Sequence, residues 1–313
     1  MEQPRTIGVH YDPVYEKHDT GPHHPESAHR YQVLCKSLEA LPKEIVRLGR
    51  RTAEVEEILL AHDKAYHDIA KRDIEALKGT LSTGDTTISK DSYKVSLEAT
   101  GAMLTAADAI MKGEVNSAYC ALRPPGHHAL GARGMGFCIF NHVAITARYL
   151  QKKHGLKKVA IIDWDVHHGN GTEAIFISDP SVLFISTHQE DIYPGTGQAE
   201  VRGRGEGLGF NLNLPLPRAS DGNYALKIWD KQITPKINDF MPDFLLVSAG
   251  YDARKDDPIG GLNWDDDTFT QMTKRCVRYA NKHCNGRILS MLEGGYNPEG
   301  LASSSVAHVK ALA

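Results

Sequence analysis

The stretch Lys158–Asn170 reads KVAIIDWDVHHGN and combines a strand signal with a chemical signal. Its first half, VAII, is an unbroken apolar run rich in β-branched residues. Such a run is typical of a strand that is covered on both faces, as strands of parallel sheets are. Its second half carries two aspartates, two histidines and an asparagine. The stretch therefore predicts a buried strand that ends in chemically capable side chains.

Similar apolar runs recur along the chain, with segments suited to helices between them. This alternation favours an α/β fold with one parallel sheet and helices on both of its faces. The predicted strands are Thr6–Tyr11, Glu44–Leu48, Ser117–Leu122, Lys158–Asp163, Val182–Thr187, Phe210–Leu214, Phe244–Ser248 and Arg287–Leu292. The predicted helices are Pro25–Leu41, Lys64–Leu77, Ser92–Lys112, Asn141–Lys153, Asp221–Phe240 and Asp265–Lys282.

Composition narrows the class of protein. The chain has 313 residues, 41% of them hydrophobic and 24% charged, and its formal net charge is −3. These values indicate a globular protein of one large domain or two, and argue against nucleic-acid binding through overall charge. The five cysteines are scattered without a CxxC spacing, which favours a reducing compartment, and we expect the cytoplasm. No signal peptide or membrane-spanning run is expected.

Polar side chains follow five of the predicted strands at the point where each strand ends. In an open parallel sheet, ligands bind just beyond the carboxyl ends of the strands, so these groups are expected to converge on one rim. They are His127-His128, Asp163 to Asn170, Ser186 to His188, Tyr251-Asp252 and Glu293 to Tyr296.

The segment Asp163, Asp165, His167 indicates a metal site. Residues spaced two apart point to the same side of an extended chain, and two carboxylates with an imidazole suit a borderline cation such as Zn²⁺. A further ligand has to come from elsewhere, and Asp252 is the candidate. The alternative is a polar strand end that caps the next helix, and Asp252 by itself is more often a turn or cap residue.

His127, His128 and Tyr296 are candidates for the chemistry around such a metal. The two imidazoles, stiffened by Pro-Pro-Gly before them, are suited to general acid and base roles. Tyr296 follows two glycines and is suited to stabilising an oxyanion. The alternatives are a solvated histidine pair and a half-buried packing tyrosine. Glu293 is interpreted as a structural hydrogen-bonding residue.

Together these residues resemble the zinc-dependent histone deacetylase family. The resemblance runs along nearly the whole chain in the family's order, and its details resemble the class II and bacterial branch. The motifs are HDTGPHHPESAHR (His18–Arg30), RPPGHHA, GFCIFNHVAI, IIDWDVHHGNGT, YPGTG, SAGYDARKDDPIGG and LEGGYN. The resemblance implies the arginase/deacetylase fold, a three-layer αβα arrangement with an eight-stranded parallel sheet, as one catalytic domain over residues 1–313.

The resemblance also implies roles for individual residues. Asp165, His167 and Asp252 would bind one Zn²⁺ per chain, and Tyr296 would hold the oxyanion. His127 and His128 would be the tandem histidines, with Asp163 behind the first and Asn170, in place of an aspartate, behind the second. The narrow acyl-lysine channel and its rim would comprise Gly136, Phe137, Tyr193, Ile259 and Asp85. A structural K⁺ would be held by oxygens of Asp163, Asp165, His167, Ser186 and Thr187.

We interpret the protein as a zinc-dependent amide hydrolase that removes acetyl or other acyl groups from lysine or lysine-like amines. An acetylpolyamine or other small-molecule amidohydrolase is the alternative, and a non-catalytic acyl-lysine-binding module is a weaker one. A two-metal, arginase-like hydrolase is disfavoured because Gly169 and Arg254 stand where a second metal needs carboxylates. Ile259 argues mildly against a strict polyamine enzyme. The expected partners are acylated substrates, and the oligomeric state is left open.

Overall fold

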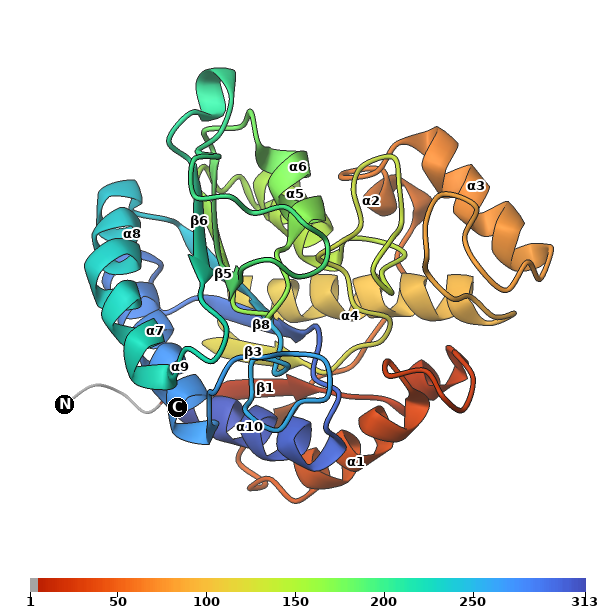
Figure 1. The fold of residues 1–313 in the computed structure, drawn as a ribbon, viewed down its shortest axis with the longest axis horizontal. Helices are drawn as coiled ribbons and strands as arrows, with labels where there is room; N and C mark the ends of the chain where they lie inside the picture. The colour runs from red at the N-terminus through yellow and green to blue at the C-terminus, as the bar shows by residue number, and fades with distance from the viewer. Residues whose placement is uncertain (1–4) are drawn as a thin grey trace.

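The computed structural model describes residues 5–313, and within them eight strands form one all-parallel sheet (Figure 1). The order across the sheet is β2-β1-β3-β8-β7-β4-β5-β6. This confirms the predicted parallel α/β architecture. The strands are β1 (Ile7–His10), β2 (Val46–Arg47), β3 (Ser117–Cys120), β4 (Val159–Asp163), β5 (Val182–Gln189), β6 (Asn211–Leu216), β7 (Phe244–Ala249) and β8 (Ile288–Leu292).

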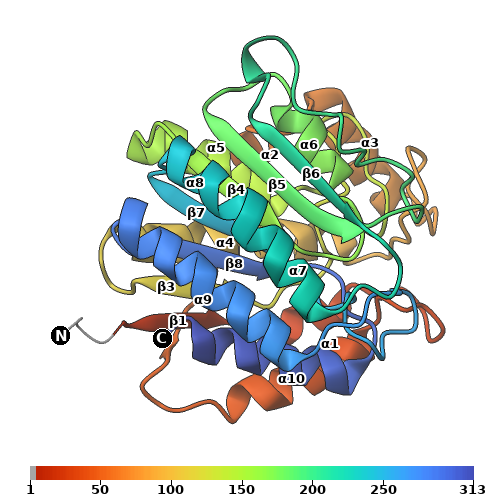
Figure 2. The same ribbon diagram turned by 60° about the vertical axis from the view of Figure 1, so that its left-hand side comes forward.

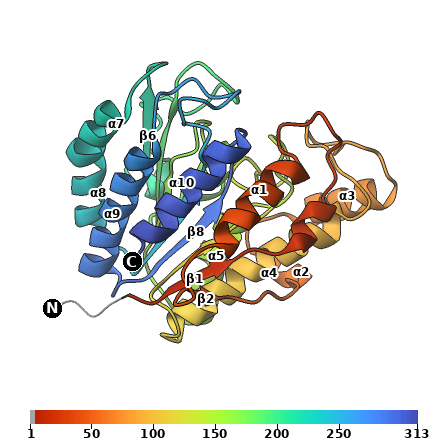
Figure 3. The same cartoon turned by 90° about the horizontal axis from the view of Figure 1, so that it is seen from below.

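Two layers of helices enclose the sheet. In Figure 2 one layer lies in front of the strands, and Figure 3 shows two of its helices, α1 and α10, side by side. This front layer is α1 (Ala28–Glu39), α7 (Gly222–Ile228), α8 (Thr234–Phe240), α9 (Asp266–His283) and α10 (Pro298–Ala311). The layer behind is α2 (Val55–Ile58), α3 (Lys64–Glu75), α4 (Ser92–Met111), α5 (His142–His154) and α6 (Asn170–Phe176).

The central strands are apolar because both of their faces are covered. Every residue of β3, β4, β7 and β8 is buried. At roughly 25 cal/mol per Å² of apolar surface, this burial is the main force that holds the three layers together.

Three features differ from the sequence expectation. The segment Asp221–Phe240, predicted as one helix, is divided into α7, a π-helical turn at Trp229–Ile233 and α8. Pro235 lies in the first turn of α8 and has no N–H to bond back into the preceding turn, so the regular bonding pattern is interrupted there. Helices α2, α6 and α10 were not predicted, and β5 continues through His188 to Gln189.

Because the strands are parallel, their carboxyl ends meet at one edge of the sheet. The register pairs Asp163 at the end of β4 with Ser186 of β5 on one side and with Ser248 of β7 on the other. The polar segments that follow β3, β4, β7 and β8 therefore arise within a few strand spacings of one another.

Candidate active site

Three ligand-type side chains converge just beyond the sheet edge. Asp165 and His167 lie after β4, and Asp252 lies after the neighbouring strand β7. His167 Nδ1 is 3.1 Å from a carboxylate oxygen of Asp165 and 3.1 Å from one of Asp252. All three residues are buried, and their ligand-type atoms lie within 4.8 Å of one another. Over the described range 5–313, this is the one group of His, Cys, Asp or Glu side chains with such geometry.

The surroundings of this group fit a divalent cation. Burial raises the pKa of Asp252, and the Asp165 carboxylate beside it raises that pKa further, because like charges repel in a dry site. A bound cation would offset that repulsion. Gly294 permits the close approach: a Cβ there would collide with both carboxylates, whereas its N–H donates to Asp165 Oδ2 at 2.8 Å. Two carboxylates and one imidazole form a donor set suited to Zn²⁺.

The chain after β4 is bent, not extended as the sequence suggested. Asp163 Oδ1 accepts from the Asp165 N–H at 3.1 Å, and Asp165 Oδ1 accepts from the His167 N–H at 2.9 Å. Each aspartate thus closes a tight turn two residues on. The bend separates Asp163 from the other two side chains, so Asp165 and His167 face Asp252 while Asp163 faces His127.

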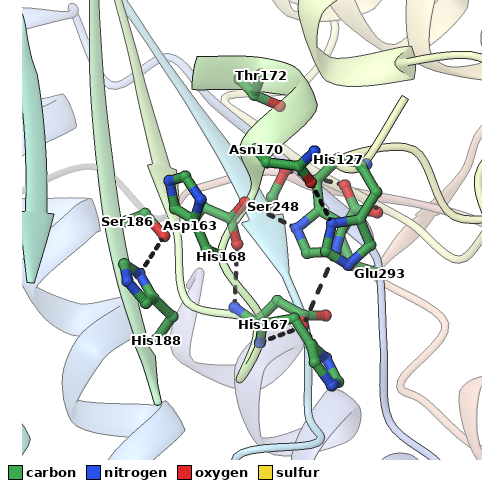
Figure 4. Close-up of polar contacts among 12 residues, drawn as sticks. His127, Asp163, His167, His168, Asn170, Thr172, Ser186, His188, Ser248 and Glu293 are labelled. Carbon is green, nitrogen blue, oxygen red and sulfur yellow. Dashed lines mark hydrogen bonds and ion pairs between the residues drawn. The ribbon is translucent and has the colours of Figure 1, made fainter. Parts of the chain in front are cut away.

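His127 is fixed by two carboxylates. Its Nδ1–H donates to Asp163 Oδ2 at 3.0 Å, as Figure 4 shows from the side of β4 and β5. Burial opposes a charge on this imidazole, but Asp163 and then Asp165 more than offset that effect and raise the pKa of His127 well above its usual range. The backbone N–H groups of Gly126 and His127 donate to Glu293, which also accepts from Ser248 Oγ. Glu293 is the structural hydrogen-bonding residue that the sequence predicted.

His128 is in a different environment. Its Nδ1 is 2.7 Å from Asn170 Oδ1, an acceptor, so Nδ1 carries the proton and Nε2 of the neutral ring is bare. Burial lowers the pKa of His128 well below its usual range, and His127 and His167 lower it further. The two tandem histidines therefore differ in charge preference, with the first favouring imidazolium and the second favouring neutral imidazole.

Tyr296 is held in place through its backbone. Its N–H donates to Asp257 Oδ2 at 2.7 Å, while Asp257 Oδ1 accepts from the N–H groups of Ile259 and Gly260. The Arg30 guanidinium lies 5.3 Å from the centre of the Tyr296 ring. Burial raises the pKa of Tyr296 well above 10, so the phenol keeps its proton and remains a donor.

A cavity of about 170 Å³ connects these groups with the predicted channel residues. Tyr193 meets His128 edge-to-face with ring centres 5.2 Å apart, and Phe137 meets Tyr296 in the same way at 6.1 Å. Gly136 has φ +58° and lies against His128, where a Cβ would collide with the ring. The cavity is lined by Asp85, His128, Gly136, Phe137, His167, Tyr193, Ile259 and Tyr296.

Asp85 occupies a position at the rim. Its Oδ1 accepts from the Gly136 N–H at 2.7 Å, and its Oδ2 accepts from the Tyr193 hydroxyl at 3.1 Å. The carboxylate thus braces the two channel walls against each other.

The residues predicted for a potassium site lie where β4 ends and in the neighbouring part of β5. Thr187 Oγ1 is 3.4 Å from the Asp163 carbonyl oxygen, and Ser186 pairs with Asp163 in the register. Asp165 and His167 follow in the bend after β4. All five residues therefore share one end of this strand pair.

One buried ionic cluster was not predicted from the sequence. Glu26 accepts from Arg30 at 2.9 Å and from Arg123 at 2.9 Å, and all three side chains are buried. Arg30 also donates to the carbonyl oxygens of Glu293 and Gly295, on the turn that carries Tyr296. The i, i+4 spacing of Glu26 and Arg30 was the available signal, but nothing local indicates that the pair is buried beneath a distant turn.

A family model described as the histone deacetylase domain matches residues 24–312. The chain belongs to the histone deacetylase family.

Individual relatives agree with this assignment. The chain is 38% identical over 300 residues to a "Probable deacetylase" of Archaeoglobus fulgidus, and the match covers 94% of this chain and 82% of the relative. It is 42% identical over 308 residues to "Histone deacetylase 14, chloroplastic" of Arabidopsis thaliana, covering 92% of this chain and 73% of the relative. The crystal structure of the HDA15 HD domain matches with a TM-score of 0.91 at 31% identity, covering 99% of this chain and 90% of that one.

These findings confirm the predicted family, the arginase/deacetylase fold and the hydrolytic deacetylase function. The family is zinc-dependent, and Asp165, His167 and Asp252 provide this deacetylase with a candidate site for the ion. None of the helices within residues 5–313 is long and apolar enough to span a bilayer.

Proposed function

We propose that this deacetylase hydrolyses acetyl-lysine side chains, with Asp165, His167 and Asp252 holding one Zn²⁺ and with His128 and Tyr296 acting on the reacting amide. The observation that carries the proposal is the single cavity that His128, His167 and Tyr296 line together with the predicted channel residues. When bound, Zn²⁺ supplies Lewis acidity and lowers the pKa of a water molecule.

Each proton transfer of the reaction is then assigned to one of the protein side chains. His128 Nε2, bare because Nδ1 donates to Asn170, takes the proton of the attacking water. Tyr296 O–H donates to the oxyanion that develops on the amide oxygen. The protonated His128 delivers its proton to the departing lysine amine. His127, charged through Asp163, orients this proton transfer and stabilises negative charge.

The experiment that tests the proposal is a measurement of acetate release from acetyl-lysine peptides, acetylspermidine and longer acyl-lysines by the zinc-loaded protein. Acetate release from acetyl-lysine peptides is the expected result. If the protein releases no acetate or other acid from any member of the panel, the assignment of these residues to amide hydrolysis is wrong.

The two histidines are expected to contribute unequally. His128→Ala should lower kcat by about 10²–10⁴, the range for losing a general acid–base, while His127→Ala should cost less. Steady-state kinetics on one acetyl-lysine peptide checks this, with thermal unfolding of both variants as the control for folding. Equal losses, or a larger loss in His127→Ala, would contradict the division of roles.

The residues at the rim of the cavity indicate which substrate class is preferred. Ile259 lines the cavity mouth with 40% of its surface exposed, and an apolar side chain offers no partner to a second ammonium group. Asp85, the rim carboxylate in the same cavity, already accepts from Gly136 and Tyr193. These contacts favour acetyl-lysine peptides over acetylpolyamines, which remain the alternative substrates.

Replacing Ile259 with glutamate is therefore expected to narrow the difference between the two substrates. The ratio of kcat/KM for an acetyl-lysine peptide to that for acetylspermidine should exceed one in the wild type and fall in Ile259→Glu. Ile259→Gln, which adds polarity without charge, is the matched control. A wild-type preference for acetylspermidine of tenfold, about 1.4 kcal/mol, would instead favour the polyamine alternative.

Further properties remain predictions. We propose K⁺ at the β4–β5 end, supported by the shared position of its five predicted residues, and a single catalytic domain over residues 1–313. A cytoplasmic location is supported by the cysteines, all five of which are buried and free.

A further inference from the structure

The loop of residues 190–201, called the Tyr193 loop from here on, carries one wall of the cavity through Tyr193. It follows β5 and contains turns and bends but no helix or strand. Tyr193 lies in it, with its ring centre 5.2 Å from that of His128 and 6.3 Å from that of His167. A wall built on an irregular loop keeps its position only if other contacts fix that loop.

Two buried histidines contact this loop three and four residues beyond Tyr193. His168 Nδ1 forms a hydrogen bond with Thr196 Oγ1 at 2.8 Å. His188 Nε2–H donates to the Gly197 carbonyl oxygen at 2.9 Å. Figure 4 shows the two imidazoles on the same side of β5, and their ring centres are 4.8 Å apart. His168, the second member of the pair that begins with His167, has no role in the proton transfers proposed above.

The protonation state of the His188 imidazole follows from its hydrogen-bond partners. The Gly197 carbonyl can only accept, so Nε2 carries the proton. Burial lowers the pKa of His188 to about 3, so the ring is neutral and Nδ1 accepts from Ser186 Oγ at 2.9 Å. Both nitrogens are thus committed, and the ring is held between β5 and the Tyr193 loop.

Gly197 makes this contact possible. It has φ +93°, and a Cβ there would collide with His188 Nε2 and lie 2.7 Å from His168 Cγ. The backbone therefore passes directly over both imidazoles, which only glycine permits.

A third group of contacts continues along the loop. Asn213 Nδ2 donates to the Gln198 carbonyl at 3.3 Å, and Asn211 Nδ2 donates to the Val201 carbonyl at 2.8 Å. Both amides also donate to Glu173 Oε2, which lies 3.3 Å from His168 Nε2. The polar residues from α6, β5 and β6 therefore anchor the loop from Thr196 onwards.

We propose that His168 and His188 are positioning residues that hold Tyr193 against the cavity through Thr196 and Gly197, and so set the affinity for the aliphatic chain of the substrate. The proposal rests on the proposed function, because it assumes that the lysine chain lies along Tyr193. The wall contacts that chain both before and during the reaction, so its displacement weakens binding more than it slows the chemistry.

Thr196→Val tests this at an exposed position, since it removes the hydroxyl with little change of shape. KM for an acetyl-lysine peptide should rise roughly two- to tenfold, the range for one hydrogen bond, while kcat stays nearly constant. Thr196→Ser, which keeps the hydroxyl, should restore KM. Glu200→Gln, an exposed change in the same loop, is the matched control and should leave KM unchanged. An unchanged KM in Thr196→Val would overturn the proposal.

A double-mutant cycle tests whether the effect passes through Tyr193. In a Tyr193→Ala background, Thr196→Val should raise KM no further, because the wall is already absent. An equal rise in that background would show that Thr196 acts by another route and would overturn the proposal.

Hydrogen exchange separates this inference from the proposed function, because it needs no turnover. Amides of residues 190–201 should exchange faster in Thr196→Val than in the wild type or in Thr196→Ser. Unchanged exchange would refute the anchoring even in an active enzyme. Faster exchange in a protein that hydrolyses no acetyl-lysine would retain the anchoring and reject the proposed substrate.

Discussion

Asp252→Ala is expected to remove bound zinc and, with it, deacetylase activity. Asp252 is buried, and its Oδ2 lies 3.1 Å from His167 Nδ1 in the group of three ligand-type side chains. Changes outside the ligand shell already cost about 10- to 100-fold in metal affinity, so losing a ligand should cost at least that much. Metal content of the purified protein after brief exposure to a chelator measures the effect directly.

A matched variant separates metal loss from unfolding. Asp252 Oδ1 also accepts from the Val166 N–H at 2.9 Å, a contact that Asp252→Asn can keep through its amide oxygen. Both variants should therefore lose zinc, while Asp252→Asn retains more of the thermal stability of the zinc-free wild type. Full zinc occupancy in Asp252→Ala would transfer the ligand role to another residue.

Tyr296→Phe is expected to lower kcat by about 10²–10³ while zinc remains bound. The loss of one oxyanion-hole donor has this magnitude because the phenol acts where negative charge develops. The ring contact with Phe137 and the backbone bond to Asp257 do not involve the hydroxyl, so the fold should be unaffected. Steady-state kinetics together with metal analysis of the same preparation checks both parts.

Two outcomes would refute the role given to Tyr296. One is a kcat/KM near that of the wild type on the best acyl substrate. The other is a loss confined to KM, which would mean that the hydroxyl contributes only to ground-state binding.

Much of the fold was predictable because the signals were local. The apolar runs of β4, β5, β7 and β8 are long enough, and flanked by clear enough turns, to indicate covered parallel strands. The missed helices lack such signals. Helix α6 has seven residues, one of them Gly171, and α10 is rich in serine and alanine without a clear apolar stripe. Packing of α10 against α1 and α9 stabilises a helix that its own residues indicate only weakly.

For the site, the sequence by itself determined which chemical groups are present and that they follow neighbouring strands. Strand direction then brings Asp165, His167 and Asp252 to one edge, because parallel strands have their carboxyl ends together. The residues of the cavity walls were also predicted, because motifs such as GFCIFNHVAI and YPGTG resemble those of the histone deacetylase family.

The family resemblance implied which residues stand behind the two histidines, but only the tertiary structure decided how each imidazole is charged. The pKa of His127 is raised because the carboxylate of Asp163, 36 residues away, contacts its ring. Burial lowers the pKa of His128, and His127 and His167 lower it further, because the neutral amide of Asn170 offers that ring no compensating charge. Likewise, His168 reaches Thr196 across 28 residues of sequence. No local pattern encodes such contacts, because they depend on burial and on distances between elements that become neighbours only when the sheet has formed.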